Sequence, residues 1–172
     1  MFALTLLVLA AGIDAGDLPV EPVRGHFEVS LLGAGGLASV PAVGAGAGLH
    51  LEGGLVLGGS HVISARASFA TAVVLFAMQF GASFAERVND RLSLGAGLTW
   101  GGLFGVGDAA GAVTISLPLR ITGTLGDDPR RGFTLGAEVA PGVVYAGGGY
   151  GIRPTLPGAS MMVQLTAGWA WW

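Results

Sequence analysis

The sequence predicts an all-β protein, an eight-stranded antiparallel transmembrane up-and-down β-barrel. Of its 172 residues, 52% are hydrophobic and only 11% are charged, against about 25% charged in ordinary soluble domains. The 32 glycines disfavour helices, because each glycine costs up to about 1 kcal/mol in a helix interior. Apolar residues alternate with polar or small ones along most of the chain, as they do in strands. Since a membrane admits only helices or closed barrels, this composition and periodicity favour a barrel.

The first residues differ from the rest of the chain. Residues 1–16 carry an apolar run followed by small residues, which predicts a cleavable signal peptide, although no Arg or Lys precedes the run. The alternative is a buried N-terminal helix. Residues 17–24 contain two prolines and predict a short extended lead-in. Residues 25–172 form the predicted barrel domain.

Eight segments show a period of two, with one apolar face and one polar or glycine-rich face. They are residues 25–34, 45–57, 61–69, 74–87, 91–101, 112–125, 131–145 and 161–172. A tilted strand needs about 9–11 residues to cross a membrane, so each is long enough or nearly so. Glycine-rich or turn-forming stretches separate them, with expected loops at 35–44, 102–111 and 146–159. The connection near Thr71 is the least distinct, and the alternative there is a single apolar helix over 63–84.

The aromatic residues of the apolar faces support this division into strands. If successive strands run in opposite directions, these residues fall at two levels, as the aromatic girdles of membrane barrels do. The lower level, on the side of both chain ends, holds Phe27, Phe84, Phe133, Trp169 and Trp171; the upper level holds Phe69, Phe76, Trp100 and Tyr145. A further alternative is a water-soluble barrel, but such a barrel would be apolar inside and polar outside. We therefore expect the apolar faces to contact membrane lipid.

The opposite faces predict a polar network inside the barrel. Its ionisable members are Glu28, His50, Glu52, Arg66, Arg120 and Glu138, and Gln79, Thr99 and Gln164 share the same face. An unpaired buried charge costs several kcal/mol, so we expect ion pairs between neighbouring strands, Arg120 with Glu138 and Glu52 with Arg66. Such pairs would fill the lumen, because an eight-stranded barrel is just wide enough inside for side chains. The alternative is a narrow polar pore or a small-ligand cavity.

No residue pattern predicts catalysis, and we expect neither an enzyme nor a cofactor. His61 and Ser64 lie three residues apart and so on opposite faces of a strand, and His50 has no serine partner in its own segment. The glycine-rich stretches 33–36 and 105–107 do not open a helix, which removes the physical reason for phosphate binding. No metal-ligand cluster is present. With no cysteine, no lysine and a net charge of −3, nothing indicates a nucleic-acid partner.

The dyad pattern and the aromatic closing segment MMVQLTAGWAWW resemble the small eight-stranded outer-membrane barrel proteins of Gram-negative bacteria, the OmpA/OmpX-like group. The resemblance covers about residues 25–172. It implies a monomeric barrel in the bacterial cell outer membrane, in contact with outer-membrane lipid and with a structural or surface-interaction role. The alternative is a narrow porin-like pore or a small-ligand-binding or transport barrel. It also implies that the barrel-insertion machinery recognises an aromatic end of the last strand. Here Trp172 is aromatic, but Trp171 continues the apolar face, so the phase is shifted by one.

Overall fold

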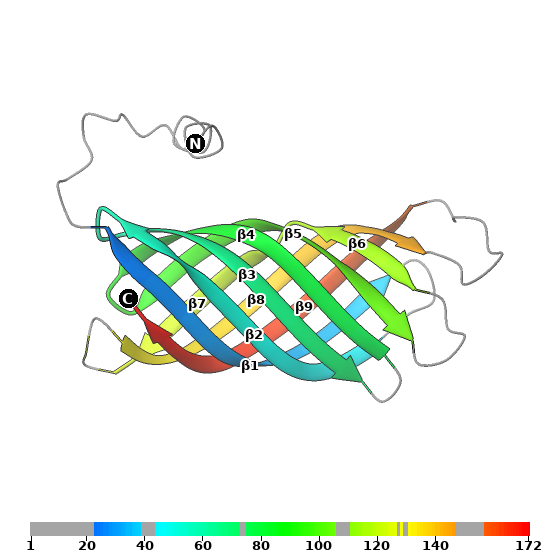
Figure 1. The fold of residues 1–172 in the computed structure, drawn as a ribbon, viewed down its shortest axis with the longest axis horizontal. Coiled ribbons are helices and arrows are strands. Elements are labelled where there is room, and N and C mark those ends of the chain that lie inside the picture. The colour runs from blue at the N-terminus through cyan, green and yellow to red at the C-terminus, as the bar shows by residue number, and fades with distance from the viewer. Residues whose placement is uncertain are drawn as a thin grey trace.

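The computed structural model describes residues 23–38, 44–72, 75–105, 111–126, 128, 131–146 and 157–172. These residues form nine strands in one antiparallel sheet that closes on itself (Figure 1). The strands are β1 (Arg24–Ala38), β2 (Gly44–Leu57), β3 (His61–Ala72), β4 (Leu75–Asn89), β5 (Leu92–Gly105), β6 (Ala112–Ser116), β7 (Leu119–Leu125), β8 (Arg131–Ala146) and β9 (Gly158–Trp171). Both β6 and β7 pair with β5 and β8, so together they form one strand of the barrel. The prediction of a closed eight-stranded antiparallel barrel is confirmed.

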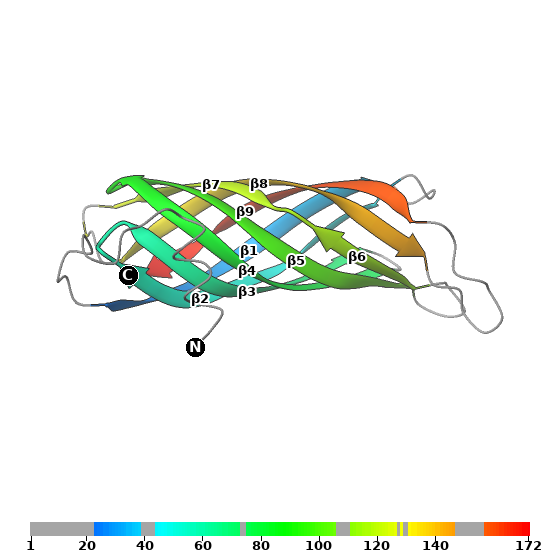
Figure 2. The same ribbon diagram turned by 90° about the horizontal axis from the view of Figure 1, so that it is seen from above.

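The barrel closes where β1 pairs with β9, and its strands are strongly staggered. A row of register partners that begins at Arg24 on β1 passes around the wall through Arg120 and returns to β1 at Ala34. The stagger is therefore 34 − 24 = 10 residues, and closure with such a stagger requires strands that tilt against the barrel axis. Figures 1 and 2 show this tilt. We call the end where β1 begins and β9 ends the near end, and the opposite one the far end.

Side chains alternate between the two surfaces of the wall, as the sequence predicts. Leu31 is 69% exposed and Leu165 61% exposed, whereas their neighbours Ser30 and Gln164 are 1% and 2% exposed. Every strand contributes a large apolar side chain to the outer surface, for example Leu31, Leu55, Phe69, Phe76, Leu98, Ile115, Ile121, Leu135 and Leu165. The outer wall is thus apolar and the inner wall polar, the reverse of a water-soluble barrel.

The sixth barrel strand is interrupted at Leu117 and Pro118, where the sequence predicts one unbroken segment. Proline has no N–H to give to a β-ladder. The ladder is held by two other bonds: the Leu117 N–H donates to the Pro141 carbonyl at 2.9 Å, and the Gly97 N–H donates to the Pro118 carbonyl at 3.0 Å. The break between β6 and β7 therefore leaves the sheet joined on both sides.

Several strand ends lie beyond the predicted ones. β1 continues to Ala38 through glycines expected in a loop, and Gly36 pairs with both Gly44 and Met162. β5 likewise continues to Gly105, and β9 begins at Gly158. Runs of glycine hide the alternation in the sequence, but the glycine backbones still pair with the neighbouring strands. The signal peptide (1–16), most of the lead-in (17–24) and much of the predicted loops 35–44, 102–111 and 146–159 lie outside the described residues.

The segment around Thr71 is strand, not helix. Residues 63–72 belong to β3 and 75–84 to β4, so the alternative of one apolar helix over 63–84 is wrong. Among the described residues, no helix is long and apolar enough to cross a membrane.

Candidate functional site: the lumen network

The six ionisable residues expected inside the barrel all point into its lumen. Glu28 on β1, His50 and Glu52 on β2, Arg66 on β3 and Glu138 on β8 are each at most 6% exposed. The Arg120 side chain, on β7, is 11% exposed. Alternation along the strands accounts for this placement, because each residue occupies an inward position of its strand. The inward Gln79, Thr99 and Gln164 are buried as well.

The predicted ion-pair partners are wrong, because the pairs cross the lumen. The Arg120 guanidinium contacts two carboxylates, with Nη2 2.6 Å from Glu28 Oε1 and Nη1 2.5 Å from Glu52 Oε2. Arg66 Nη2 lies 2.6 Å from Glu138 Oε2. Glu52 does face Arg66 in the register of β2 and β3, and Arg120 faces Glu138 in that of β7 and β8. The residues of each lateral pair thus lie side by side on the wall, but their charged groups pair with residues across the lumen.

The geometry of the barrel explains the crossing. β2 and β7 are four strands apart in either direction around the wall, and so are β3 and β8. The ion pairs Glu52–Arg120 and Arg66–Glu138 therefore connect opposite walls. An eight-stranded barrel is narrow enough inside for side chains to fill it, so a long guanidinium side chain reaches across. We call these ion pairs, with Arg120–Glu28, the cross-lumen struts.

Hydroxyl groups donate further hydrogen bonds to two of the three carboxylates. Ser64 Oγ donates to Glu52 Oε1 at 2.5 Å, and Ser83 Oγ donates to the same oxygen at 3.3 Å. Ser30 Oγ donates to Glu28 Oε1 at 2.7 Å. A buried ion pair is stable only when further hydrogen bonds satisfy the remaining lone pairs, and serines on the inner wall supply such bonds to Glu28 and Glu52.

His50 links the struts to the wall of β3. Its Nδ1 lies 2.8 Å from Ser68 Oγ, while its Nε2 lies 3.4 Å from Glu52 Oε2 and 3.3 Å from Arg120 Nη1. A neutral imidazole has one donor and one acceptor nitrogen. With Nε2 protonated, His50 donates to Glu52 and accepts from Ser68; with Nδ1 protonated, it donates to Ser68 and accepts from Arg120. Both tautomers keep His50 within the network.

A close approach of the backbone makes room for Arg120. Gly136 lies on β8 beside the Arg120 side chain, and a Cβ at this position would be 3.3 Å from Arg120 Nε and nearer still to Thr166 Oγ1. A larger residue there would force the Thr166 side chain to move and would crowd the Arg120 guanidinium. The sequence marks Gly136 only as an inward glycine, so its role was not predicted.

A second polar layer lies beside the struts. Gln164 Nε2 donates to Gln79 Oε1 at 2.9 Å and to the Met162 sulfur at 3.4 Å. The Thr99 and Ser116 hydroxyls are 2.8 Å apart. Apolar side chains also occupy the lumen, among them Leu32, Val56, Val62 and Val144, each at most 3% exposed. These apolar inward positions were not predicted from the sequence.

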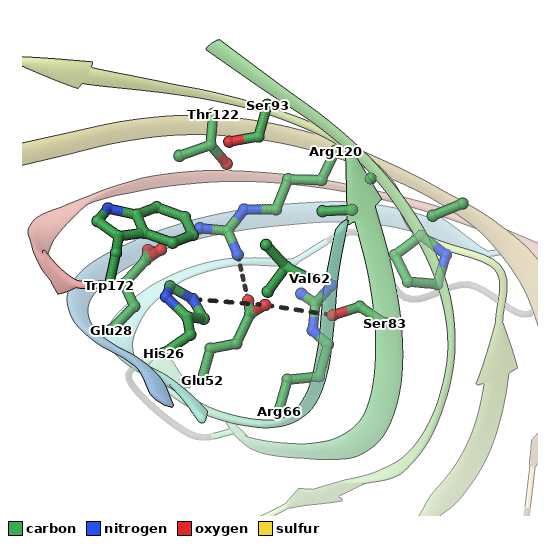
Figure 3. Close-up of a pocket in the computed structure, with 14 residues that line it drawn as sticks. His26, Glu28, Glu52, Val62, Arg66, Ser83, Ser93, Arg120, Thr122 and Trp172 are labelled. Atoms are coloured by element: carbon green, nitrogen blue, oxygen red, sulfur yellow. Dashed lines mark hydrogen bonds and ion pairs between the residues drawn. The ribbon is translucent and has the colours of Figure 1, made fainter. Parts of the chain in front are cut away.

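His26 and Trp172 are two further lumen residues, which the sequence did not predict. Their rings stack with centroids 4.1 Å apart, at the near end of the barrel beside the struts (Figure 3). A signal for them exists, since His26 has the inward phase of Glu28, and Trp172 is out of phase with the outward Trp171. Together with four of the five strut residues, all except Glu138, they border a cavity of about 30 Å³.

The predicted interface aromatics lie on the outer wall. Phe27, Phe133, Trp169 and Trp171, each 39–49% exposed, belong to the near-end parts of their strands. Phe84 is partly exposed there and stacks on His61, with ring centroids 5.8 Å apart. Phe69, Trp100 and Tyr145 are 38–55% exposed, and all three lie toward the far-end parts of their strands. Their contact with a membrane interface stays a prediction.

Comparison with known proteins identifies the type of barrel. No protein-family model matches the sequence, and no curated protein matches it significantly. The structure is similar to Neisserial surface protein A (NspA), with a TM-score of 0.58, 13% identity, and coverage of 88% of this chain and 99% of that one. It is also similar to Ail, the attachment invasion locus protein of Yersinia pestis, solved with the heparin analogue sucrose octasulfate (TM-score 0.51, 11% identity, 88% and 100% coverage). The fold is that of the small eight-stranded outer-membrane β-barrels, as the resemblance in the sequence indicated.

Proposed function

We propose that this protein is an integral β-barrel of the bacterial outer membrane, with a structural or surface-interaction role and no catalysis. The observation that carries the proposal is the inverted wall: large apolar side chains on the outside of every strand and ion pairs inside. Monomeric soluble proteins rarely expose contiguous apolar patches larger than a few hundred Å². Lipid hydrocarbon would cover such a wall at no cost, and a closed barrel leaves no unpaired strand edge in it.

The turns and the aromatic residues support one orientation. Outer-membrane barrels have short turns on the periplasmic side, and the short connections 58–60 and 90–91 both lie at the near end. The near end would then face the periplasm, with Phe27, Trp169 and Trp171 at the periplasmic interface between the outer membrane and water. In this proposal the barrel is a monomer that meets the barrel-insertion machinery during biogenesis.

A surface role is favoured over transport by the interior and by the comparisons. The struts connect opposite walls of the lumen. The near-end cavity in the described part of the barrel, about 30 Å³ in volume, has room for about two water molecules and not for an organic ligand. NspA is named a surface protein and Ail an attachment invasion locus protein.

Conductance in a planar lipid bilayer tests this choice. We expect the folded protein to insert without producing discrete current steps, because the struts obstruct the lumen. A gel shift between heated and unheated samples would show, in the same preparation, that the barrel is folded. Reproducible single-channel steps from folded protein would contradict the structural role and favour the narrow pore.

A further inference from the structure

Trp172 turns into the lumen immediately after the end of β9. The preceding Trp171 is 44% exposed on the outer wall, so consecutive tryptophans lie on opposite sides of the barrel wall. The Trp172 ring stacks on His26 with a centroid distance of 4.1 Å and an angle of 23° between the ring planes. This orientation places an indole at the near-end opening of the lumen.

Contacts from two other strands hold the ring there. The guanidinium carbon of Arg87 on β4 lies 4.9 Å from the centre of the Trp172 ring, within the range of a cation–π interaction. His26 on β1 is itself fixed, since its Nδ1 lies 3.2 Å from the Trp171 carbonyl oxygen, to which Nδ1–H can donate. Its Nε2 faces Glu52 Oε1 at 4.0 Å. The indole is therefore held from two separate strands, β1 and β4, and adjoins the strut network.

The cavity directly inside this ring is lined by both polar and apolar residues and has room for water. Trp172, His26, Arg66, Arg120, Ser93 and Thr122 are among the residues that line it (Figure 3). Its volume of about 30 Å³ accommodates about two water molecules. Arg66 Nε is buried and has no hydrogen-bond partner in the described part of the chain. Because Arg66 lines the cavity, we infer that a water molecule there accepts this hydrogen bond.

Ionic ligands fit the cavity less well. The network contains Glu28, Glu52 and Glu138 against Arg66 and Arg120, which leaves one net negative charge with the histidines neutral and disfavours an anion. Within the described residues, no group of three or more His, Asp or Glu side chains is placed to hold a metal ion. Water is the ligand that matches both the size and the unpartnered donor.

We propose that Trp172 is a lid on this cavity and that water enters and leaves past its ring. In the closed position the indole covers the cavity and stacks on His26. When the ring swings away from His26 and Arg87, the Arg66 Nε–H and its water exchange with bulk solvent at the near end. The cross-lumen struts remain in place during this motion.

Hydrogen exchange at Arg66 tests the lid. In ¹⁵N-labelled protein in detergent micelles, we expect a cross-peak between the Arg66 Nε–H proton and water. Trp172→Ala should speed the exchange of this proton about tenfold, because it removes one stacking and one cation–π contact. Trp172→Phe, which keeps an aromatic ring, should restore most of the protection. Trp171→Ala is the matched control on the outer wall and should leave the exchange unchanged.

Two results would overturn the proposal. Unchanged Arg66 exchange in Trp172→Ala would show that the ring is not a lid. A missing water cross-peak in the parent protein would show that the cavity is dry. The gel shift on heating verifies that each variant is folded, and Trp172→Leu, which keeps apolar bulk without an aromatic face, replaces the alanine variant if that one does not fold.

Discussion

Replacing Arg120 with alanine should lower the free energy of unfolding by about 3–5 kcal/mol. The guanidinium pairs with both Glu28 and Glu52, so its removal leaves two buried carboxylates without a cation. One partner lost from a buried pair costs more than the pair contributes, because the remaining charge stays desolvated. Urea unfolding of the purified barrel in detergent, followed by tryptophan fluorescence, measures the change.

Two variants make this result specific to the struts. Arg131→Ala removes the exposed pair with Asp128, whose arginine side chain is 64% exposed, and should cost less than about 1 kcal/mol. Glu28→Gln/Glu52→Gln/Arg120→Met removes the cation and both charges together, and it should recover most of the loss. If Arg120→Ala unfolds at the same urea concentration as the parent, the struts do not stabilise the barrel.

Replacing Leu165 with arginine should destabilise the barrel by about 2–4 kcal/mol in phospholipid vesicles, the cost of a cation at the bilayer midplane. Leu165 lies in the middle of β9, and its side chain is 61% exposed on the outer wall. Reversible unfolding by denaturant in vesicles gives the free energy directly.

Leu125→Arg is the matched control for this substitution. Leu125 is 54% exposed and ends β7 beside the near-end turn, where an arginine should cost about 0–1 kcal/mol because it reaches the interface. Equal effects of the two substitutions would mean that the middle of the outer wall does not lie in hydrocarbon.

For most residues, the sequence predicts whether the side chain points outward or into the lumen, because alternation is a local property of each strand. Leu31 and Leu165 face outward and Glu28 and Gln164 inward for this reason alone. The strand ends could not be predicted where glycine occupies the outward positions, the inward positions or both, as at Gly36. The break at Pro118 was also missed, although proline is a visible signal against a continuous strand.

The pairing inside the lumen could not be predicted from the same pattern. Lateral neighbours follow from strand order, which is why Arg120 and Glu138 were correctly placed side by side on adjacent strands. Which charge pairs with which depends on the width of the lumen and on the stagger of ten residues. Neither is encoded in any single segment. Trp172 was a different case, since its phase was noted but its stacking on His26 depends on how β1 and β9 meet.

The central claim is that the outer wall of this barrel lies in lipid and its inner wall does not. The chain has no cysteine, so single cysteines carrying a nitroxide label can be introduced along β9 from Met161 to Ala167. In vesicles, we expect high collision rates with oxygen, which concentrates in hydrocarbon, at Met161, Val163, Leu165 and Ala167, and low rates at the even positions between them. High collision rates with a water-soluble nickel complex at the odd positions, or no alternation at all, would contradict the membrane barrel.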